Sequence, residues 1–166
     1  PFCKDFERSC TKGKEKNMTK EVLSSIRGRQ FEEGTDENKI ETITAGDYYK
    51  KSNFHYVVYE EITEGFEQPT KNIIKFNENE LHLTKNGLVN VHMVFEENRK
   101  NMTNYVTPYG SILIGIETER VDLIEEEKRI HVDVLYALEV NYEHLADCNI
   151  AMDIREKKGS DFSLYS

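Results

Sequence analysis

Histidine and carboxylate side chains at alternate positions are the first candidates for chemistry in this chain. His131 and Asp133 are separated by one residue, so on a β-strand they share a face, as a base and its partner or two metal ligands would. The apolar residues Ile130 and Val132 occupy the opposite face of the same segment. We therefore expect His131 and Asp133 to face solvent, and His92 too, because it lies between two apolar neighbours.

Other catalytic or cofactor motifs are missing from the sequence. Cys148 falls in the apolar register of a strand, where burial raises the pKa of a thiol and leaves it a small hydrophobic group. The three cysteines form no C-x-x-C pair, and the chain has no G-x-S-x-G, P-loop or dinucleotide motif. The sequence therefore predicts no enzymatic activity, no cofactor and no metal site.

Tyrosines form the more promising group, because each combines a broad apolar ring with a hydroxyl tip that suits the wet mouth of a barrel. An arginine, Arg27 or Arg29, is a candidate counter-charge for an anionic head group. The alternative is that the tyrosines only pack between strands and that side chains fill the interior. The candidate ligand-binding residues are Arg27, Tyr48, Tyr49, Tyr56, Tyr59, Glu61, Tyr105, Tyr109 and Tyr136.

Length and charge limit the classes of protein to consider. A chain of 166 residues suits one domain. Its formal net charge of −9 and pI near 5.1 argue against nucleic acid or an anionic membrane as partner. The chain has neither an apolar run of the roughly 20 residues that a membrane helix needs nor a signal-peptide pattern. We therefore expect a cytoplasmic protein.

Period-two alternation runs through most of the sequence and predicts strands. It is cleanest from Gly110 to Ile154, which we interpret as three long antiparallel strands. Shorter strands precede it, and Asn86-Gly87 predicts a two-residue hairpin turn because both residues accept positive φ. The predicted apolar faces consist of Ile112, Ile114 and Ile116, of Ile130, Val132, Val134, Tyr136, Leu138 and Val140, and of Cys148, Ile150, Met152 and Ile154.

About ten strands without a credible helix predict an all-β fold. We expect a single antiparallel up-and-down barrel of about 8–10 strands, since closure removes exposed strand edges, with a β-sandwich as the alternative. The barrel domain is expected at residues 18–156. Residues 1–17 are expected to form a polar tail or upstream remnant, and residues 157–166 a second tail.

Three segments carry a resemblance to a known family: TAGDYYKKSNFHYVVYEE, YVTPYGSILIGIETERV and IHVDVLYALEVNYEHLADCNIAMDI. In their order and spacing they resemble the YwiB-like family, small bacterial proteins of unknown function. The resemblance implies a calycin-like (lipocalin-like) β-barrel and no particular activity. The chain contains no Trp, so the glycine-tryptophan signature of the first lipocalin strand is absent.

Two functions follow as expectations. The first is a binding module that holds a small, partly apolar or amphipathic ligand in the barrel interior. The second is a protein-interaction barrel without a cavity, a homodimer in its simplest form, which would use the outer face around Leu135, Ala137 and Ala151.

Overall fold

The computed structural model describes residues 20–31 and 38–157, with side chains described for residues 21–28 and 40–157. The tail predicted at residues 1–17 lies outside this part, as does the C-terminal tail beyond Lys157. Lys157 itself continues the sheet, because its backbone N–H donates to the carbonyl of Glu21 at 2.9 Å.

Ten strands account for most of the described chain, as the alternating pattern predicts. Every neighbouring pair is antiparallel. The strands are β1 (Lys20–Phe31), β2 (Asn38–Lys51), β3 (Phe54–Glu61), β4 (Thr70–Phe76), β5 (Glu80–Gly87), β6 (Val91–Glu96), β7 (Arg99–Thr107), β8 (Gly110–Glu125), β9 (Arg129–Val140) and β10 (Glu143–Glu156).

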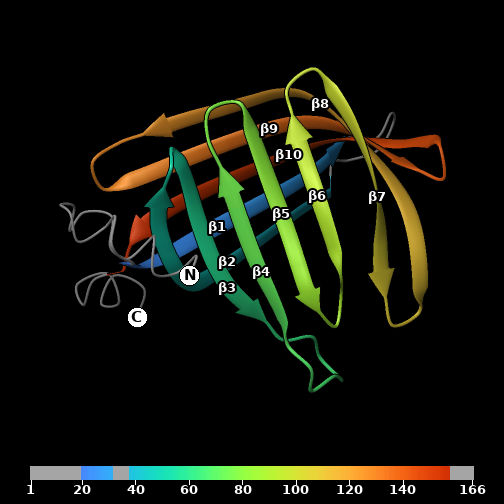
Figure 1. Cartoon of the computed structure of the whole chain (residues 1–166), viewed down its shortest axis with the longest axis horizontal. Helices are drawn as coiled ribbons and strands as arrows, with labels where there is room; N and C mark the ends of the chain where they lie inside the picture. The colour runs from blue at the N-terminus through green and yellow to red at the C-terminus, as the bar shows by residue number, and fades with distance from the viewer. Residues whose placement is uncertain (1–19, 32–37, 158–166) are drawn as a thin grey trace.

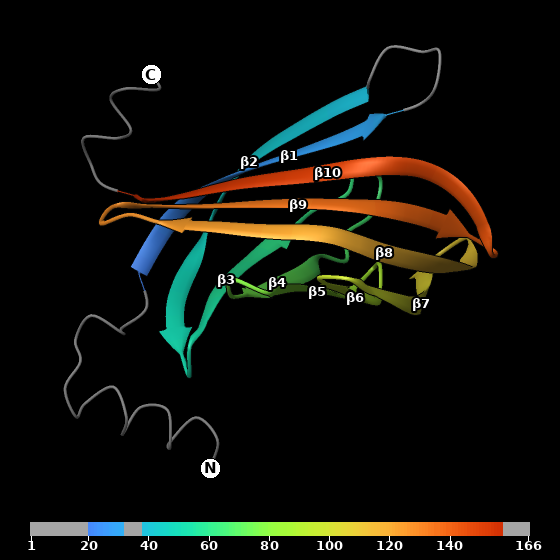
Figure 2. The ribbon, with the colours of Figure 1, turned by 90° about the horizontal axis from the view of Figure 1, so that it is seen from above.

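The strands form one continuous sheet that curls into a nearly closed barrel. Their order is β6-β5-β4-β3-β2-β1-β10-β9-β8-β7, so consecutive strands pair with each other except β6 and β7, and β1 pairs with β10. Strands β3 to β6 make one wall, and β8 to β10 cross behind them as the other (Figures 1 and 2). The predicted antiparallel up-and-down barrel is confirmed, and the sandwich is not adopted.

The barrel is least complete between β6 and β7. One antiparallel bridge joins Asn90 to Val106 through two backbone hydrogen bonds of 2.9 Å. The Asn101 side chain adds a bond from its Nδ2 to the carbonyl of Val94 at 3.3 Å. Because a full ladder is missing here, this seam is the weakest join around the barrel.

Alternate residues of each strand face the inside of the barrel and build its core. In β9, Ile130, Val132 and Val134 are buried, and in β10 the same holds for Cys148 and Met152. The predicted apolar faces of these strands are therefore confirmed. The largest fully buried apolar side chains of the described residues are Phe76, Phe95, Ile116, Met152, Val57, Val132 and Val134.

Strand β2 changes partners part-way along its length. It pairs with β1 from Asn38 to Tyr48, but with β3 only from Asp47 to Lys51. Strand β3 meets it closely at Gly46, where an added Cβ would lie 2.7 Å from the carbonyl oxygen of Val58. Beyond that point the N-terminal half of β2 continues beside β1 and away from β3 (Figure 2).

The predicted two-residue turn at Asn86-Gly87 is wrong. Gly87 still pairs with Thr70 of β4, and pairing with β6 ends at Lys85 opposite Val91. The Asn90 side chain closes the longer turn instead, because its Nδ2 donates to the Gly87 carbonyl at 2.8 Å and its Oδ1 accepts from the Gly87 N–H at 3.2 Å.

Candidate functional site

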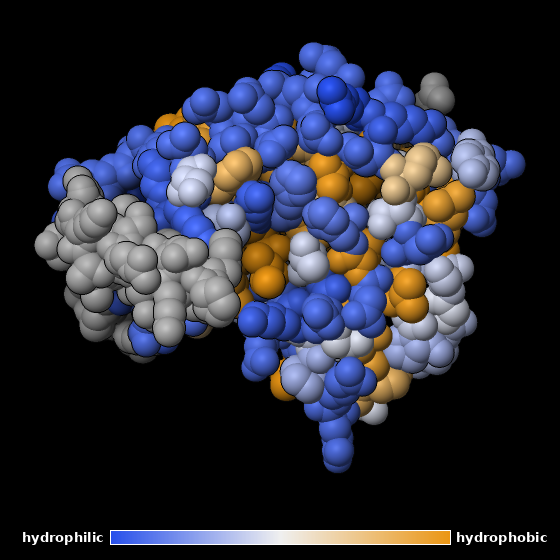
Figure 3. Space-filling view, in the orientation of Figure 1, coloured by the Kyte–Doolittle hydropathy of each residue, from blue (hydrophilic) through white to orange (hydrophobic). Residues whose placement is uncertain are grey.

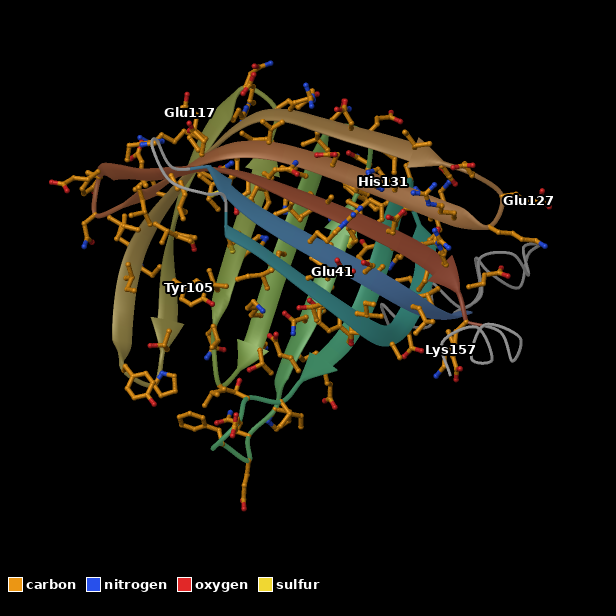
Figure 4. All side chains as sticks on the ribbon, turned by 180° about the vertical axis from the view of Figure 1, so that it is seen from behind. Glu41, Tyr105, Glu117, Glu127, His131 and Lys157 are labelled. Carbon is orange, nitrogen blue, oxygen red and sulfur yellow. The ribbon has the colours of Figure 1, made fainter. Side chains whose placement is uncertain are left out.

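Five of the nine candidate ligand residues face the inside of the barrel: Tyr48, Tyr59, Glu61, Tyr105 and Tyr136. Tyr48 lies opposite the buried Val57, which lies opposite the buried Ile74, so all three share the inner face. Tyr59 and Glu61 follow Val57 at intervals of two. Tyr105 lies on β7 (Figure 4) and packs against the core, close enough to Glu61 for its charge to act on the tyrosine.

The other four candidates lie outside. Tyr49 and Tyr56 stack on each other on the outer face, with ring centroids 4.7 Å apart. Arg27 also points outward and approaches Asp153 at 3.7 Å. Tyr109 is 88% exposed in the turn between β7 and β8 and meets Phe66 edge-on. None of the four lines the interior, and the side chain of Arg29 lies outside the described part.

A polar cluster occupies the inner face at the ends of β3 and β5 and the beginning of β4. Lys85 Nζ contacts Glu61 Oε1 at 2.7 Å and Asn72 Oδ1 at 2.8 Å, and Asn72 Nδ2 donates to Glu61 Oε1 at 3.1 Å. Burial raises the pKa of Glu61, but the bonds from Lys85 and Asn72 outweigh it and hold this pKa below its usual value. The pair is therefore charged and internally neutral.

Tyr59 and Tyr105 complete what we call the inner polar cluster, with Glu61, Asn72 and Lys85. Burial, and secondarily the charge of Glu61, raises the pKa of Tyr59 to about 12 and that of Tyr105 above its usual value. Both hydroxyls therefore stay protonated and able to donate. Neither makes a hydrogen bond to another residue that the structure describes, so both are available to a ligand.

Apolar side chains also line the inner wall of the barrel, and several of them remain partly exposed to solvent. They pack against the core on one side and keep accessible surface on the other, which means that solvent reaches the inside of the barrel here. Figure 3 looks onto the outer side of the wall formed by β3 to β6, where hydrophobic residues are visible among hydrophilic ones; the inner wall lies behind it. These inner-wall residues are Ile26, Leu83, Met93, Leu138, Val140 and Ile150.

Tyr136 belongs to the packed part of the interior rather than to this open wall. Its ring meets Phe95 edge-on at 4.9 Å, which joins the two walls. Burial, followed by the neighbouring Cys148 thiol, raises the pKa of Tyr136. Burial likewise raises the pKa of Cys148, as the sequence predicts. The polar tip of Tyr136 is thus used inside the protein.

A second group of polar residues, the His55 cluster, ties β2, β3 and β8 together inside the barrel. Tyr48 Oη lies 2.7 Å from His55 Nδ1, and His55 Nε2 lies 3.5 Å from Glu125 Oε1. Lys50 approaches the other oxygen of Glu125 at 3.8 Å. The His55 ring also stacks on Phe76 at 5.0 Å. The His55 side chain is buried by these contacts, whereas Lys50 and Glu125 remain partly exposed.

The ionisation of this cluster favours a structural role. Burial is the main cause that lowers the pKa of His55, with Lys50 acting in the same direction and Glu125 opposing them. Burial, and secondarily the charge of Glu125, raises the pKa of Tyr48 to about 12, so its hydroxyl stays protonated beside the imidazole. Such a tyrosine is a poor base or nucleophile, because its deprotonated form is disfavoured.

The lowered pKa of His55 predicts a pH dependence of stability. In the unfolded chain His55 titrates near its ordinary pKa of 6.5, so below that pH the unfolded state binds the proton first. Stability should therefore be full above about pH 6.5 and fall as the pH decreases through 6 toward 5. The stability of the His55→Phe variant, which keeps a ring against Phe76, should fall less steeply with decreasing pH. Urea unfolding at several pH values measures this, and equal slopes would contradict it.

His131 lies on the outer face, as predicted, in a network of ion pairs (Figure 4). Asp153 Oδ1 accepts from Arg129 Nε at 2.7 Å and lies 3.2 Å from His131 Nδ1. Although burial raises the pKa of Asp153, these partners lower it overall. Asp133 lies beside them and accepts from Asn149. Among the described residues, no three His, Cys, Asp or Glu side chains form a group that could hold a metal ion.

Five polar residues of the two interior clusters were not among the candidates from sequence: Asn72, Lys85, His55, Lys50 and Glu125. The first two carry a usable signal, because each is a polar residue within an apolar register. Asn72 precedes Ile74 and Phe76 at intervals of two, and Lys85 follows Leu81 and Leu83 in the same way. His55 and Glu125 come from distant strands, so their contact depends on closure of the barrel.

Comparison with known proteins places the chain in a family. Residues 25–152 match the family described as "Domain of unknown function (DUF1934)". The chain is 25% identical over 126 residues to the uncharacterised β-barrel protein YwiB of Bacillus subtilis, covering 74% of this chain and 87% of that one. The crystal structure of the B. subtilis ywiB protein superposes with a TM-score of 0.74 at 19% identity, over 84% of this chain and 94% of the other.

These matches agree with the resemblance noted in the sequence and with the barrel seen in the structure. In the described residues there is no helix long and apolar enough to cross a membrane. The chain belongs to the DUF1934 family of β-barrel proteins related to YwiB, whose function is unknown.

Proposed function

We propose that the protein is a binding module for a small amphipathic ligand, held in the open part of the barrel interior. The observation that carries this proposal is the partly exposed inner wall: Leu83, Met93, Leu138 and Ile150 face inward, yet solvent reaches them. Apolar surface inside a barrel gains free energy when a ligand removes it from water. We place this activity in the cytoplasm and assign it no catalytic step.

The inner polar cluster would bind the polar end of such a ligand. Tyr59 and Tyr105 supply two hydroxyl donors without partners among the described residues, beside the ion pair of Glu61 and Lys85. The Lys85 side chain is only 16% exposed and already contacts Glu61 and Asn72. Because its charge is neutralised, an additional anion would gain little there. The cluster therefore favours an uncharged head group, such as a hydroxyl, carbonyl or amide.

This assignment changes the chemistry inferred from the sequence. An anionic head group was expected to meet Arg27, but that side chain lies outside the barrel near Asp153. The cation that does face inward, Lys85, is paired. The calycin-like relationship implied by the resemblance agrees with an interior ligand and remains part of the proposal.

The uncharged amphipathic dye N-phenyl-1-naphthylamine tests the proposal directly. Wild-type protein should enhance its fluorescence and saturate. Met93→Trp should weaken dye binding by about tenfold, because a larger ring on the inner wall overpacks the site. The matched control is Val94→Trp, on the outer face of the same strand, which should bind like wild type. Fluorescence titration measures both.

Two results would contradict the proposal. One is no saturable binding of the dye by folded wild-type protein. The other is an equal loss in the Met93→Trp and Val94→Trp variants, which would indicate a general effect on folding instead of a site. If neither result is found, native mass spectrometry of protein purified from its source would identify the bound molecule. Its head group should be uncharged.

A further inference from the structure

The N-terminal half of β2 has a free edge. Residues 38–46 pair with β1 on one side, but β3 begins to pair only at Asp47. Nothing in the described part of the chain is hydrogen-bonded to the other side. Figure 2 shows this half of β2 at the outside of the sheet, away from β3. Its outward N–H and C=O groups are therefore open to another strand.

This edge carries little of the usual protection against pairing. Edge strands are commonly protected by charges, prolines or bulges. Here Ile40 and Ile43 are 72% and 61% exposed, and Lys39 and Glu41 are the two charged residues among positions 38–46. The pairing with β1 is regular throughout, without a bulge. The segment thus offers both a regular backbone and exposed β-branched side chains to an incoming strand.

We propose that a second copy of this chain pairs with this edge, β2 against β2, as an antiparallel two-fold dimer. A two-fold interface brings the same edge from both copies together, so both free edges are satisfied at once. The symmetry requires one residue to lie opposite itself, because opposed residues of antiparallel strands share a face.

The sequence restricts which residue lies on the two-fold axis. Centring on Glu41 would place two glutamates directly opposite each other, which is destabilising. Centring on Ile43 would extend the pairing to Asp47, which already pairs with Val58 of β3. Centring on Thr42 avoids both conflicts and stays within the free edge.

In this register, Thr42 lies opposite Thr42, Ile40 opposite Thr44, and Glu41 of one copy opposite Ile43 of the other. β-branched residues suit such cross-strand positions. The sheet would run without interruption from one barrel into the other. This interface is separate from the ligand site and does not depend on it.

Opposite substitutions at one exposed position test both the dimer and its register. Ile43→Lys places a lysine opposite Glu41 twice per dimer and should tighten dimerisation by roughly 2- to 30-fold. Ile43→Glu creates two like-charge pairs and should weaken it by a similar factor. The double variant Glu41→Lys/Ile43→Glu should restore dimerisation. Sedimentation velocity over a range of concentrations measures all four proteins, and circular dichroism verifies that they are folded.

Hydrogen exchange supplies a second measurement that needs no substitution. Amides of residues 40–44 that face the free edge should exchange more slowly as the wild-type concentration rises through the dimerisation range. A monomer at every concentration, unaffected by either substitution, would overturn the proposal. A dimer that Ile43→Lys and Ile43→Glu weaken equally would also overturn the proposal, because that result indicates a hydrophobic contact without paired strands.

Discussion

Phe95→Ala is expected to lower the free energy of unfolding by about 3–5 kcal/mol. Phe95 is fully buried on the inner face of β6 and meets Tyr136 of the opposite wall edge-on. Truncation removes both apolar burial and this contact between walls, and the strands on either side cannot collapse freely into the space. Equilibrium unfolding in urea measures the loss.

The neighbouring residue provides the control. Val94 lies on the outer face of the same strand and is only half-buried. Val94→Ala should therefore change stability by no more than about 1 kcal/mol. If Phe95→Ala were equally mild, the walls would not be packed together at this position, and the closed part of the interior would have to be reconsidered.

Gly87→Ala is the second substitution with a large expected effect, a loss of at least about 2 kcal/mol. Gly87 has a φ of +148°, and an added Cβ would lie 2.2 Å from the carbonyl oxygen of Pro69. Both the backbone conformation and the contact with neighbouring backbone disfavour a side chain. Because Gly87 pairs with Thr70, the displacement would reach the strand that carries Asn72.

Other glycines separate these two causes. Gly65 has a φ of +89° but open space around it, so Gly65→Ala reports the backbone conformation alone. Gly46 has the close contact with Val58 without a positive φ, so Gly46→Ala reports the contact alone. Gly28 has neither, and Gly28→Ala should be nearly neutral. Of the four variants, Gly87→Ala should have the lowest melting temperature in thermal unfolding. A lower melting temperature for any of the other three would contradict the explanation that the two causes add.

The sequence was sufficient for the strands because their alternation is local. Strands β9 and β10 are long and have one consistently apolar face, so their positions and inner residues could be predicted. In β8 the same alternation identifies the buried Ile114 and Ile116, but the predicted Ile112 is 43% exposed, and a bulge between Thr118 and Arg120 shifts the register. The turn after β5 could not, because Asn86-Gly87 satisfies the rule for a short hairpin. The deciding interactions, Gly87 with Thr70 and with the Asn90 side chain, come from a neighbouring strand and from beyond the turn.

The site was only partly predictable, for a related reason. Tyr48 and Tyr49 must face opposite sides, but large residues occur in both registers of β2 and β3. Only the register with β4, where Val57 lies opposite Ile74, identifies the inner side. Lys85 is predictable, because its position in an apolar register marks it as an interior cation. The meeting of His55 and Glu125 depends on barrel closure, which no local pattern encodes.

The pairing of β1 with β10 has a consequence for how the chain folds. These strands are the first and last of the described chain, and they are joined by a full ladder from Val22 opposite Glu156 to Phe31 opposite Asp147. The join between consecutive strands β6 and β7, by contrast, is a single bridge. The protein therefore places its extensive closing contacts at the greatest sequence separation, a high contact order that is typical of β-barrels folding in milliseconds to seconds.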